Sequence, residues 1–406
     1  MTSVEVFLDP AVRVGTLHVH RARGAESASF TYDADYLGRP GAYALEPALP
    51  LRSGAFHLSG RLFGAFADSS PDRWGRTLVR RALAEAARAA GETPRQPGEA
   101  DFLLGVRDDL RQGALRYRVP GDPAGAFRAD AADGVPVLTE LGTLLSLADR
   151  VLADEADLAD LRRLVGAGSS LGGARPKAHV LLPGGTVGIA KFPSEAHDEW
   201  NVMAWEKVAL DLAAAAGIAV PPSQLVPVAG RDVLVVERFD RRAAGRRDSG
   251  ERIGYVSAMT MLEATDGDRA SYLDLAEVIE ESSPRAAADL EQLWRRAAFG
   301  ALINNTDDHL RNHGFLRDKG GWVLSPAFDL NPTPFRTPFA TDIADPGDGG
   351  SIPALLDVAD YFRLSRERAT QVLAEVSSAV AGWGRAAASY GIGERERARL
   401  SSAFTA

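Results

Sequence analysis

The stretch Thr306-Asp-Asp-His-Leu-Arg-Asn312 (TDDHLRN) is the part of this sequence that decides its interpretation. Within it, Asp307 and Asn312 have the spacing D-x-x-x-x-N, which brings one carboxylate and one amide into a single polar loop. A carboxylate can accept the proton of a hydroxyl group, and an amide oxygen can bind a hard cation. Chance produces this spacing often, so the residues that follow it determine what it means.

A short β-hairpin is predicted directly after the loop, over residues 313–324, with a Lys-Gly-Gly turn at its centre. The second strand leads to Asp329 in the sequence Pro-Ala-Phe-Asp-Leu. In protein kinases the same two-strand step separates the catalytic aspartate and the metal-binding asparagine from a second, magnesium-binding aspartate. The pattern therefore predicts phosphoryl transfer, with Asp307 as the base and with Asn312 and Asp329 as ligands of Mg²⁺.

Two alternative interpretations concern the same loop. Asp308 could act as the base in place of Asp307, although the D-x-x-x-x-N spacing favours Asp307. Asp308 and His309 could also join Asp329 in the metal site of a hydrolase. That site would require a closed cluster of histidines and carboxylates, and His313 is the only other histidine nearby in the sequence.

A lysine that could contact nucleotide phosphates lies upstream, in a second predicted hairpin. A Pro-Gly-Gly turn joins two predicted strands over residues 177–192, and Lys191 occupies the second strand much as the V-A-I-K lysine does in kinases. A lysine in a strand is otherwise a solvated edge residue. Its acidic partner would come from the helix predicted over 198–216. There we prefer Glu206, beside the apolar stripe, to Glu199, which the helix dipole alone explains.

A glycine-rich segment, residues 166–173, precedes this hairpin. Its spacing does not match G-x-G-x-x-G, but Gly172 and Gly173 would leave backbone N–H groups open to a phosphate. Ser169 and Ser170 stand within it, where a serine ordinarily contributes only turn hydrogen bonds. The segment is a candidate phosphate loop.

The rest of the chain predicts an α+β fold, with strands near the N-terminus and helices toward the C-terminus. One helix is expected to begin at Ser70-Pro71-Asp72 with Ser70 as its N-cap, and the polar run 240–252 is expected to be a solvated loop. Further strands are predicted over 4–8, 14–19, 105–119 and 233–239, and further helices over 138–153, 158–164 and 290–302. Three parts are expected: a β-rich module over 1–135, a region with the phosphate loop and hairpin over 136–254, and a helical part with the catalytic loop over 255–406.

Bulk properties exclude several classes of protein. The chain has 406 residues, a formal net charge of -9 and no cysteine. Disulfides and thiolate zinc sites are therefore excluded, and a global electrostatic attraction to nucleic acid is not expected. The N-terminus lacks the features of a signal peptide, and no apolar run approaches the roughly 20 residues that span a bilayer. We expect a cytoplasmic protein without membrane contact.

Taken together, these motifs resemble the HipA family, the kinase toxins of bacterial toxin–antitoxin pairs. The likeness spans nearly the whole chain and implies a protein-kinase-like, two-lobed fold, with a β-rich N-terminal module and a mainly helical C-terminal lobe. The stretches that carry it are Phe63-Gly-Ala-Phe66, Pro71-Asp-Arg-Trp-Gly-Arg76, Ser170-Leu-Gly-Gly-Ala-Arg-Pro-Lys-Ala178, Ala190-Lys-Phe-Pro193, Val236-Glu-Arg-Phe-Asp-Arg241, Thr306–Asn312 and Ser325-Pro-Ala-Phe-Asp-Leu330.

The resemblance also implies roles for single residues. Lys191 would contact the phosphates of ATP, while Glu237 and Phe239 would line the adenine pocket. His309, together with the phosphate-loop residues Gly172 and Gly173, would complete the nucleotide site. Ser170 corresponds to the serine that these toxins autophosphorylate, and the adjacent Ser169 is the alternative acceptor.

The function that the resemblance implies is that of an ATP- and Mg²⁺-dependent protein serine/threonine kinase that inhibits translation and limits itself by autophosphorylation. The implied partners are a small DNA-binding antitoxin similar to HipB, through which alone the chain would reach DNA, and a protein substrate such as an aminoacyl-tRNA synthetase. Two other functions stay open at this point: a small-molecule kinase, and a catalytically silent co-repressor.

Overall fold

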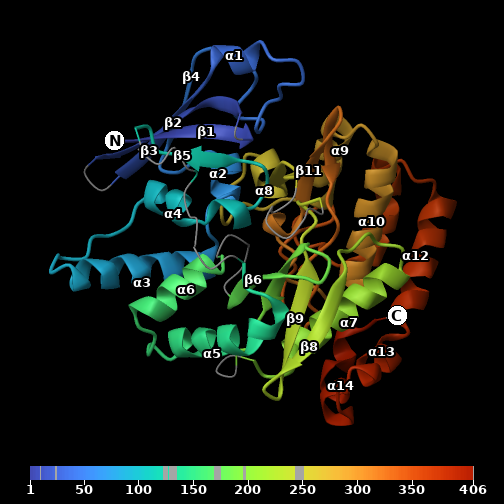
Figure 1. Ribbon diagram of the computed structural model, residues 1–406. Coiled ribbons are helices and arrows are strands. Elements are labelled where there is room, and N and C mark those ends of the chain that lie inside the picture. The colour runs from blue at the N-terminus through green and yellow to red at the C-terminus, as the bar shows by residue number, and fades with distance from the viewer. Residues whose placement is uncertain are drawn as a thin grey trace. The chain divides into compact units, whose positions relative to one another are not determined.

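The computed structural model divides into two compact units. Each contains helices and strands, which Figure 1 labels along the chain. The first unit comprises Met1–Phe192 and Asp240–Val256, and the second comprises Pro193–Phe239 and Ser257–Ala406. The structure describes residues 1–9, 11–22, 25–121, 127, 135–168, 175–194, 198–242 and 251–405.

A five-stranded antiparallel sheet forms the N-terminal part of the first unit, in the order β4-β3-β2-β1-β5. Side chains alternate between its faces, so one row of apolar residues, Val4, Leu17, Phe30 and Phe56, runs across four paired strands and is buried throughout. This alternation is the pattern that predicted strands in the first twenty residues, and that prediction is confirmed. The strands are β1 Thr2–Asp9, β2 Val12–Ala22, β3 Ala25–Tyr32, β4 Ala55–Ser59 and β5 Arg116–Arg118.

Helix α3 (Arg73–Ala89) starts close to the predicted position but with a different cap. The side chain of Asp72, rather than that of Ser70, accepts a hydrogen bond from the backbone N–H of Gly75 at 2.6 Å. Ser70 instead donates to the carbonyl oxygen of Phe66 at 3.0 Å, which ties it to the preceding short helix α2 (Gly64–Asp68). The predicted N-cap was therefore wrong, because the serine satisfies a carbonyl behind it and the aspartate is left to cap α3.

The strand predicted over 105–119 was mostly wrong. Its beginning is the end of helix α4 (Glu99–Gly105), and β5 occupies Arg116–Arg118 alone. Asp101 starts α4 by accepting a hydrogen bond from the backbone N–H of Gly98 at 2.8 Å. The guanidinium group of Arg111 is buried between these elements and donates to the carbonyl oxygens of Ser69 and Val106, at 2.8 and 3.0 Å. Contacts with distant backbone therefore override the apolar alternation of the segment.

The predicted helices and hairpin that follow are confirmed. Asp157 caps α6 by accepting from the backbone N–H of Asp160 at 2.9 Å, and α6 packs against α3. In the hairpin, Lys177 stands opposite Lys191. These elements are α5 Leu141–Leu152, α6 Leu158–Gly166, β6 Lys177–Leu181 and β7 Val187–Lys191.

The polar run 240–252 also belongs to the first unit, and its ends are not solvated as expected. Asp240 and Arg241 are 3% and 9% exposed. The Asp240 carboxylate accepts from the N–H of Gly113 at 2.8 Å, and Arg241 donates to the carbonyl oxygen of the same glycine at 3.0 Å. Near the other end, Arg252 donates to the carboxylate of Asp108 at 2.8 Å. The run returns to the first unit because its charges pair there.

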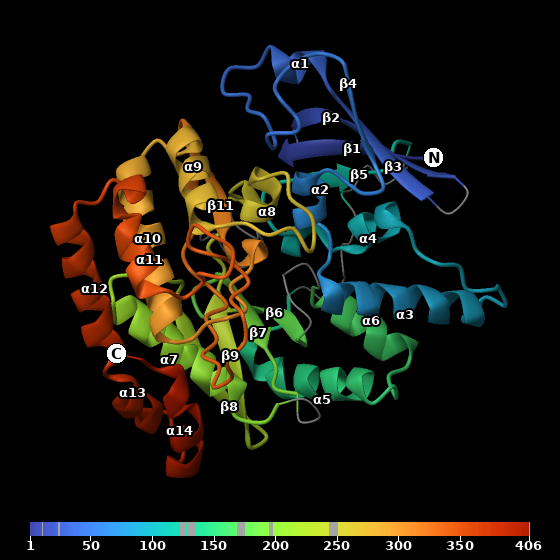
Figure 2. The same ribbon diagram turned by 180° about the vertical axis from the view of Figure 1, so that it is seen from behind.

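The second unit is mainly helical, and Figure 2 shows several of its helices lying side by side. Helix α10 packs against α9 and α12, while α7 packs against α12 and α13. The predicted apolar face of α10 is confirmed, since Leu290, Leu293 and Trp294 are fully buried. The helices are α7 Val202–Ala215, α8 Ala258–Met261, α9 Tyr272–Ser282, α10 Ala286–Leu302, α11 Ile352–Asp357, α12 Arg366–Val380, α13 Trp383–Ser389 and α14 Glu394–Leu400.

Two hairpins complete the second unit. The first joins β8 (Ser223–Val228), which the sequence did not predict, to β9 (Arg231–Glu237). The second joins β11 (Gly314–Asp318) to β12 (Gly321–Leu324) directly after the TDDHLRN stretch, as expected. The expected α+β class is thus confirmed, while the division into three parts stays a prediction.

Among the residues that the structure describes, no helix has the length and apolarity that crossing a membrane requires.

Candidate functional site

The TDDHLRN loop begins where helix α10 ends. Asn304 has a φ of 50°, in the left-handed region that asparagine tolerates better than most residues, and it turns the chain out of the helix. Its side-chain amide donates to the carbonyl oxygens of Thr333 and Phe335 at 2.6 and 2.9 Å, which fixes the turn. The helix end therefore positions the residues that follow it.

Asp307 and Asn312 lie at the two ends of the loop and are joined by a hydrogen bond. The Nδ2 group of Asn312 donates to the carbonyl oxygen of Asp307 at 3.0 Å. This bond fixes which end of the amide is the oxygen, and Asn312 is only 8% exposed. Asp307, in contrast, is exposed. The loop thus presents a carboxylate to solvent beside an oriented amide.

Asp329 is electrostatically close to Asp307, as the two-strand step predicted. The protein around Asp307 raises the pKa of its carboxyl above the ordinary value by desolvation; His309 lowers it, and the negative charges of Asp329 and Asp308 raise it. Asp329 itself has a φ of 58° and accepts a hydrogen bond from the side chain of Asn331 at 3.2 Å. Carboxylates held within reach of one another favour a cation between them.

Asp308 has a different environment from its neighbour. It is 9% exposed, its carboxylate accepts a hydrogen bond from the hydroxyl of Tyr272, and Nε2 of His313 lies 3.2 Å from its Oδ1. Burial alone would raise the pKa of Asp308, but the positive charge of His313, the hydrogen bonds and the charge of His309 together lower it. Asp308 therefore anchors the loop to Tyr272 and His313 inside the protein. Asp307 is the aspartate of the pair that a substrate could reach.

The side chains of Asn312 and Asp329 suit the few protein ligands that Mg²⁺ needs better than they suit the closed histidine and carboxylate cluster of a metal hydrolase. Over the described part of the chain, no three histidine, aspartate or glutamate side chains gather closely enough to hold a metal ion. The closed cluster that the hydrolase alternative requires is therefore missing from those residues. Mg²⁺ is commonly held by one or two carboxylates, with water and substrate phosphates as its other ligands, so Asn312 and Asp329 would suffice.

Phe239 lies near the segment that carries Asp329. Its ring centroid is 5.6 Å from that of Phe328, and the two rings are tilted by 37°. Glu237, at the end of β9, donates its backbone N–H to the carbonyl oxygen of Pro222 at 2.8 Å. The second unit thus brings a candidate adenine-binding aromatic residue to the neighbour of a candidate metal ligand.

Lys191 and Glu206 belong to different units, and their pairing stays a prediction. Lys191 ends strand β7 in the first unit. Glu206 is 2% exposed within α7 of the second unit. Glu199, the alternative acid, is exposed and pairs with Arg399. Glu199 is thus engaged at the surface of the second unit, and the choice of Glu206 stays a prediction.

The predicted phosphate-loop residues Ser169, Ser170, Gly172 and Gly173 lie outside the described residues. The chain just before them requires glycine, because Gly168 has a φ of 89° and a Cβ there would stand 2.1 Å from Nδ1 of His179.

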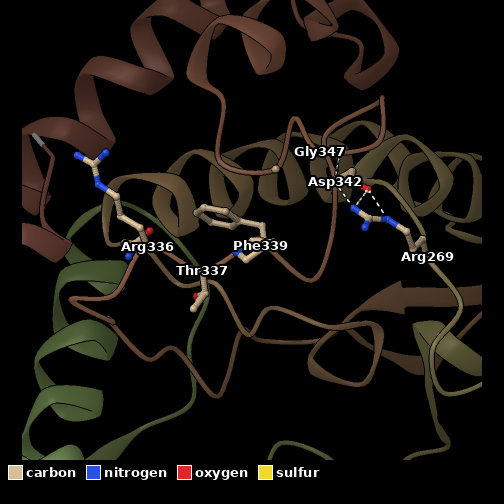
Figure 3. A pocket seen from close by; sticks show the side chains of 9 residues that line it. Arg269, Arg336, Thr337, Phe339, Asp342 and Gly347 are labelled. Atoms are coloured by element: carbon tan, nitrogen blue, oxygen red, sulfur yellow. Dashed lines mark hydrogen bonds and ion pairs between the residues drawn. The ribbon is translucent and has the colours of Figure 1, made fainter.

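One part of the site was not predicted from the sequence. The segment 333–342 is hydrogen-bonded along the TDDHLRN loop: Thr337 donates to the hydroxyl of Thr306 at 2.7 Å, the N–H of Ala340 donates to the carbonyl oxygen of Thr306 at 2.9 Å, and Thr341 donates to that of Asp308 at 2.5 Å. A cavity of about 260 Å³ borders this segment (Figure 3). The segment follows no helical or strand period, so its two prolines and clustered threonines were its only signal.

Comparison with known proteins covers both parts of the chain. Residues 4–109 match the model of the HipA N-terminal domain, and residues 169–383, more than half of the chain, match that of the HipA-like C-terminal domain. A curated relative from Sinorhizobium fredii, described as "Putative kinase Y4mE", is 30% identical over 253 residues. That match covers 54% of this chain and 57% of the relative's own length.

A solved structure shows the same fold. It is that of the Shewanella oneidensis HipA, HipB and operator DNA complex, with a TM-score of 0.70 and 18% sequence identity. The match covers 98% of this chain and 94% of the Shewanella chain. The two domain models, in the expected order and over most of the sequence, establish that this chain belongs to the HipA family.

Proposed function

We propose that the chain is an ATP-dependent protein serine/threonine kinase and the toxin of a toxin–antitoxin pair. The observation that carries the proposal is the pairing of an exposed carboxylate, Asp307, with an oriented amide, Asn312, and a nearby second carboxylate, Asp329. Phosphoryl transfer in kinases uses one carboxylate facing the acceptor hydroxyl and oxygen ligands for magnesium. Membership of the HipA family and the kinase description of the Sinorhizobium relative support the same activity.

In this mechanism, the hydroxyl oxygen of a substrate serine or threonine attacks the γ-phosphorus of ATP, the bond from that phosphorus to the β–γ bridging oxygen breaks, and ADP leaves. Asp307 accepts the hydroxyl proton and later releases it to solvent. Asn312 and Asp329 would hold Mg²⁺, which supplies positive charge to the phosphate oxygens when bound. The raised pKa of Asp307 brings its basicity closer to that of an effective proton acceptor.

Further residues take the roles that the family implies. Lys191 would bind the ATP phosphates with Glu206 as its acidic partner, and Glu237 and Phe239 would line the adenine pocket. His309 would contact the nucleotide, as the family implies; its Nδ1 has no hydrogen-bond partner among the described residues.

Regulation and partners follow the same family pattern. Phosphorylation of Ser170, or of Ser169, would place about -1.5 to -2 charges in the phosphate loop and repel ATP. The Shewanella protein was solved with HipB and operator DNA, so we propose a HipB-like antitoxin as the partner and DNA contact through that complex. The protein substrate would act in translation, as an aminoacyl-tRNA synthetase does.

The decisive experiment incubates the purified chain with γ-labelled ATP and Mg²⁺, alone and with a bacterial lysate. Wild type should label itself and at least one lysate protein. Asp307→Asn should reduce the rate by about 10²–10⁴-fold, as loss of a general base does. Asp360→Asn, which changes another exposed aspartate of the second unit, is the matched control and should retain the wild-type rate.

Each other outcome identifies a different error. Label on a small metabolite alone would support the small-molecule kinase. No label on any acceptor, with the fold intact, would support a silent co-repressor. Equal rates for wild type and Asp307→Asn would remove Asp307 from the mechanism.

A further inference from the structure

We propose that the cavity beside the TDDHLRN loop is a docking subsite for an acidic side chain of the protein substrate, next to the residue that is phosphorylated. Arg269, Arg336, Thr337, Phe339 and Asp342 are among the residues that border it. The inference rests on the proposed protein kinase activity and adds a preference for one class of substrate sequence.

The cavity is held at a fixed place relative to the proposed catalytic base. Thr337 lines it and donates to the hydroxyl of Thr306, the residue directly before Asp307. Asn304, two residues further back, also lines it. A peptide whose acceptor hydroxyl meets Asp307 would therefore bring its neighbouring side chains to this cavity.

The size of the cavity fits a side chain. Its volume is about 260 Å³. Sites for drug-sized ligands and cofactors commonly have about 300–1,000 Å³, so this cavity lies below their usual range. A volume of this size suits one side chain of a bound peptide.

One end of the cavity is an ion pair whose positive member faces outward. Arg269 contacts the carboxylate of Asp342 through two nitrogens, at 2.7 to 3.2 Å, and the two side chains point toward each other in Figure 3. The Asp342 side chain is 6% exposed whereas that of Arg269 is 60% exposed. The carboxylate of Asp342 also accepts a hydrogen bond from the backbone N–H of Gly347 at 2.9 Å, so Arg269 is not its sole partner. The pair therefore presents a guanidinium group to solvent.

The opposite end carries a second arginine. Arg336 is exposed, and no hydrogen bond or ion pair joins its side chain to another described residue. In Figure 3 it extends from the end of the cavity away from Arg269, with Thr337 and Phe339 between them. The charged groups that line the cavity are thus two arginines and one aspartate, a net charge of +1 in a chain whose formal net charge is -9.

Between the arginines, the lining of the cavity includes the ring of Phe339, and glycines leave the space that this ring occupies. Phe339 lies over Gly350, where a Cβ would come within 2.4 Å of the ring, and over Gly349, where it would stand 2.5 Å from Cβ of Phe339. The ring of Phe339 can occupy this position only because neither Gly349 nor Gly350 carries a side chain. A glutamate would fit such a surface, because its methylene groups can cover the ring while its carboxylate meets a guanidinium group.

The test uses serine peptides of otherwise constant sequence with Glu, Gln or Lys at one position at a time on either side of the serine. Their kcat/KM as substrates and their binding, by fluorescence anisotropy, are measured for wild type, Arg336→Glu and Arg385→Glu. Arg385 is an exposed arginine of α13 with no side-chain partner among the described residues, which makes it the matched control.

Wild type should prefer Glu to Gln, and Gln to Lys, at one or two positions, by about 1.5- to fivefold per step, as solvent-accessible charge pairs do. Arg336→Glu should invert the order, whereas Arg385→Glu should keep it. If wild type does not distinguish the three peptides in binding, or if Arg336→Glu keeps the wild-type order, the inference is wrong. Binding with this charge preference but without phosphate transfer would instead refute the proposed function and leave the acidic subsite standing.

Discussion

Asp307 and Asp308 are adjacent in the sequence but have opposite surroundings. Asp307 is exposed, and its pKa is raised by desolvation and by neighbouring carboxylates. Asp308 is buried under the loop, and a histidine and a tyrosine lower its pKa. One therefore suits chemistry with a substrate and the other suits support of the loop.

This contrast predicts different effects of the same substitution on stability. Asp308→Asn should lower the free energy of unfolding by about 1–3 kcal/mol at neutral pH, because it weakens buried charge-assisted contacts. Asp307→Asn should change it by no more than about 0.5 kcal/mol, or raise it slightly. Urea unfolding followed by circular dichroism measures both. Equal losses for the two variants would contradict the division of roles.

The pH dependence of the Asp308 effect has a definite sign. Because folding lowers the pKa of Asp308, its ionised form stabilises the fold above the ordinary aspartate pKa of about 4. That contribution is lost as the pH falls through the lower pKa of the folded state. The Tm difference between wild type and Asp308→Asn should therefore shrink as the pH falls below about 4. A difference that grows on acidification would reverse the assigned direction.

At the scale of elements, helix α3 is joined to strand β6 by a buried ion pair. The Nζ of Lys177 is 2.7 Å from a carboxylate oxygen of Asp72, and both side chains are 4% exposed. The indole N–H of Trp74 donates to the carbonyl oxygen of Lys177 at 3.2 Å. Asp72 thus caps a helix and neutralises a buried cation at the same time.

Substitutions at this pair should separate the two roles. Asp72→Ala should cost about 3–5 kcal/mol of stability, since it leaves the charge of Lys177 buried without a partner. Asp72→Asn, which keeps a capping oxygen worth about 1 kcal/mol, should cost less than Asp72→Ala. The double variant Asp72→Ala/Lys177→Met should recover part of the loss because no unpaired charge remains. Chemical denaturation of these variants and of Lys177→Met alone measures this. A double variant whose loss equals the sum of the losses of Asp72→Ala and Lys177→Met would exclude coupling.

Elements with a strong local pattern could be predicted from the sequence, and those set by distant contacts could not. Helix α10 and the hairpins β6–β7 and β11–β12 follow from apolar spacing and turn residues. The buried guanidinium group of Arg111 donates to the carbonyl oxygen of Ser69, 42 residues away, and this contact, which no local pattern contains, helps to set the course of residues 105–119. The same distinction applies to the site, because Asp307, Asn312 and Asp329 are separated by fixed local spacings. The cavity at Arg336 depends on hydrogen bonds from residues 333–342 to residues 304–308.

At the scale of the whole molecule, the chain leaves the first unit after Phe192 and returns to it over Asp240–Val256. The returning segment brings Asp240 and Arg241 to Gly113, and Arg252 to Asp108. The first unit therefore lacks part of its buried polar network unless both pieces of sequence are present.

A fragment of residues 1–192 should consequently be unstable by itself. Without the returning segment, Asp108 loses an arginine and the backbone groups of Gly113 lose their partners, each worth about 1–3 kcal/mol when left unsatisfied. The fragment should unfold over a broad range of denaturant and be cleaved rapidly in limited proteolysis. The same fragment with residues 240–256 attached through a Gly/Ser linker is the control and should recover a cooperative transition. A cooperative transition in the shorter fragment would show that the segment is dispensable.

The hydrogen bonds that hold the segment 333–342 against the TDDHLRN loop come from threonine hydroxyls, from backbone groups and from Asn304, and none comes from Arg336. Position 336 can therefore vary in descendants of this sequence without moving Asp307. Under the proposed function, substitution of this single exposed residue would change the preferred target and leave the proposed catalytic groups in place. For protein engineering, position 336 is a place to diversify first, because changes in target preference there are separated from loss of the fold.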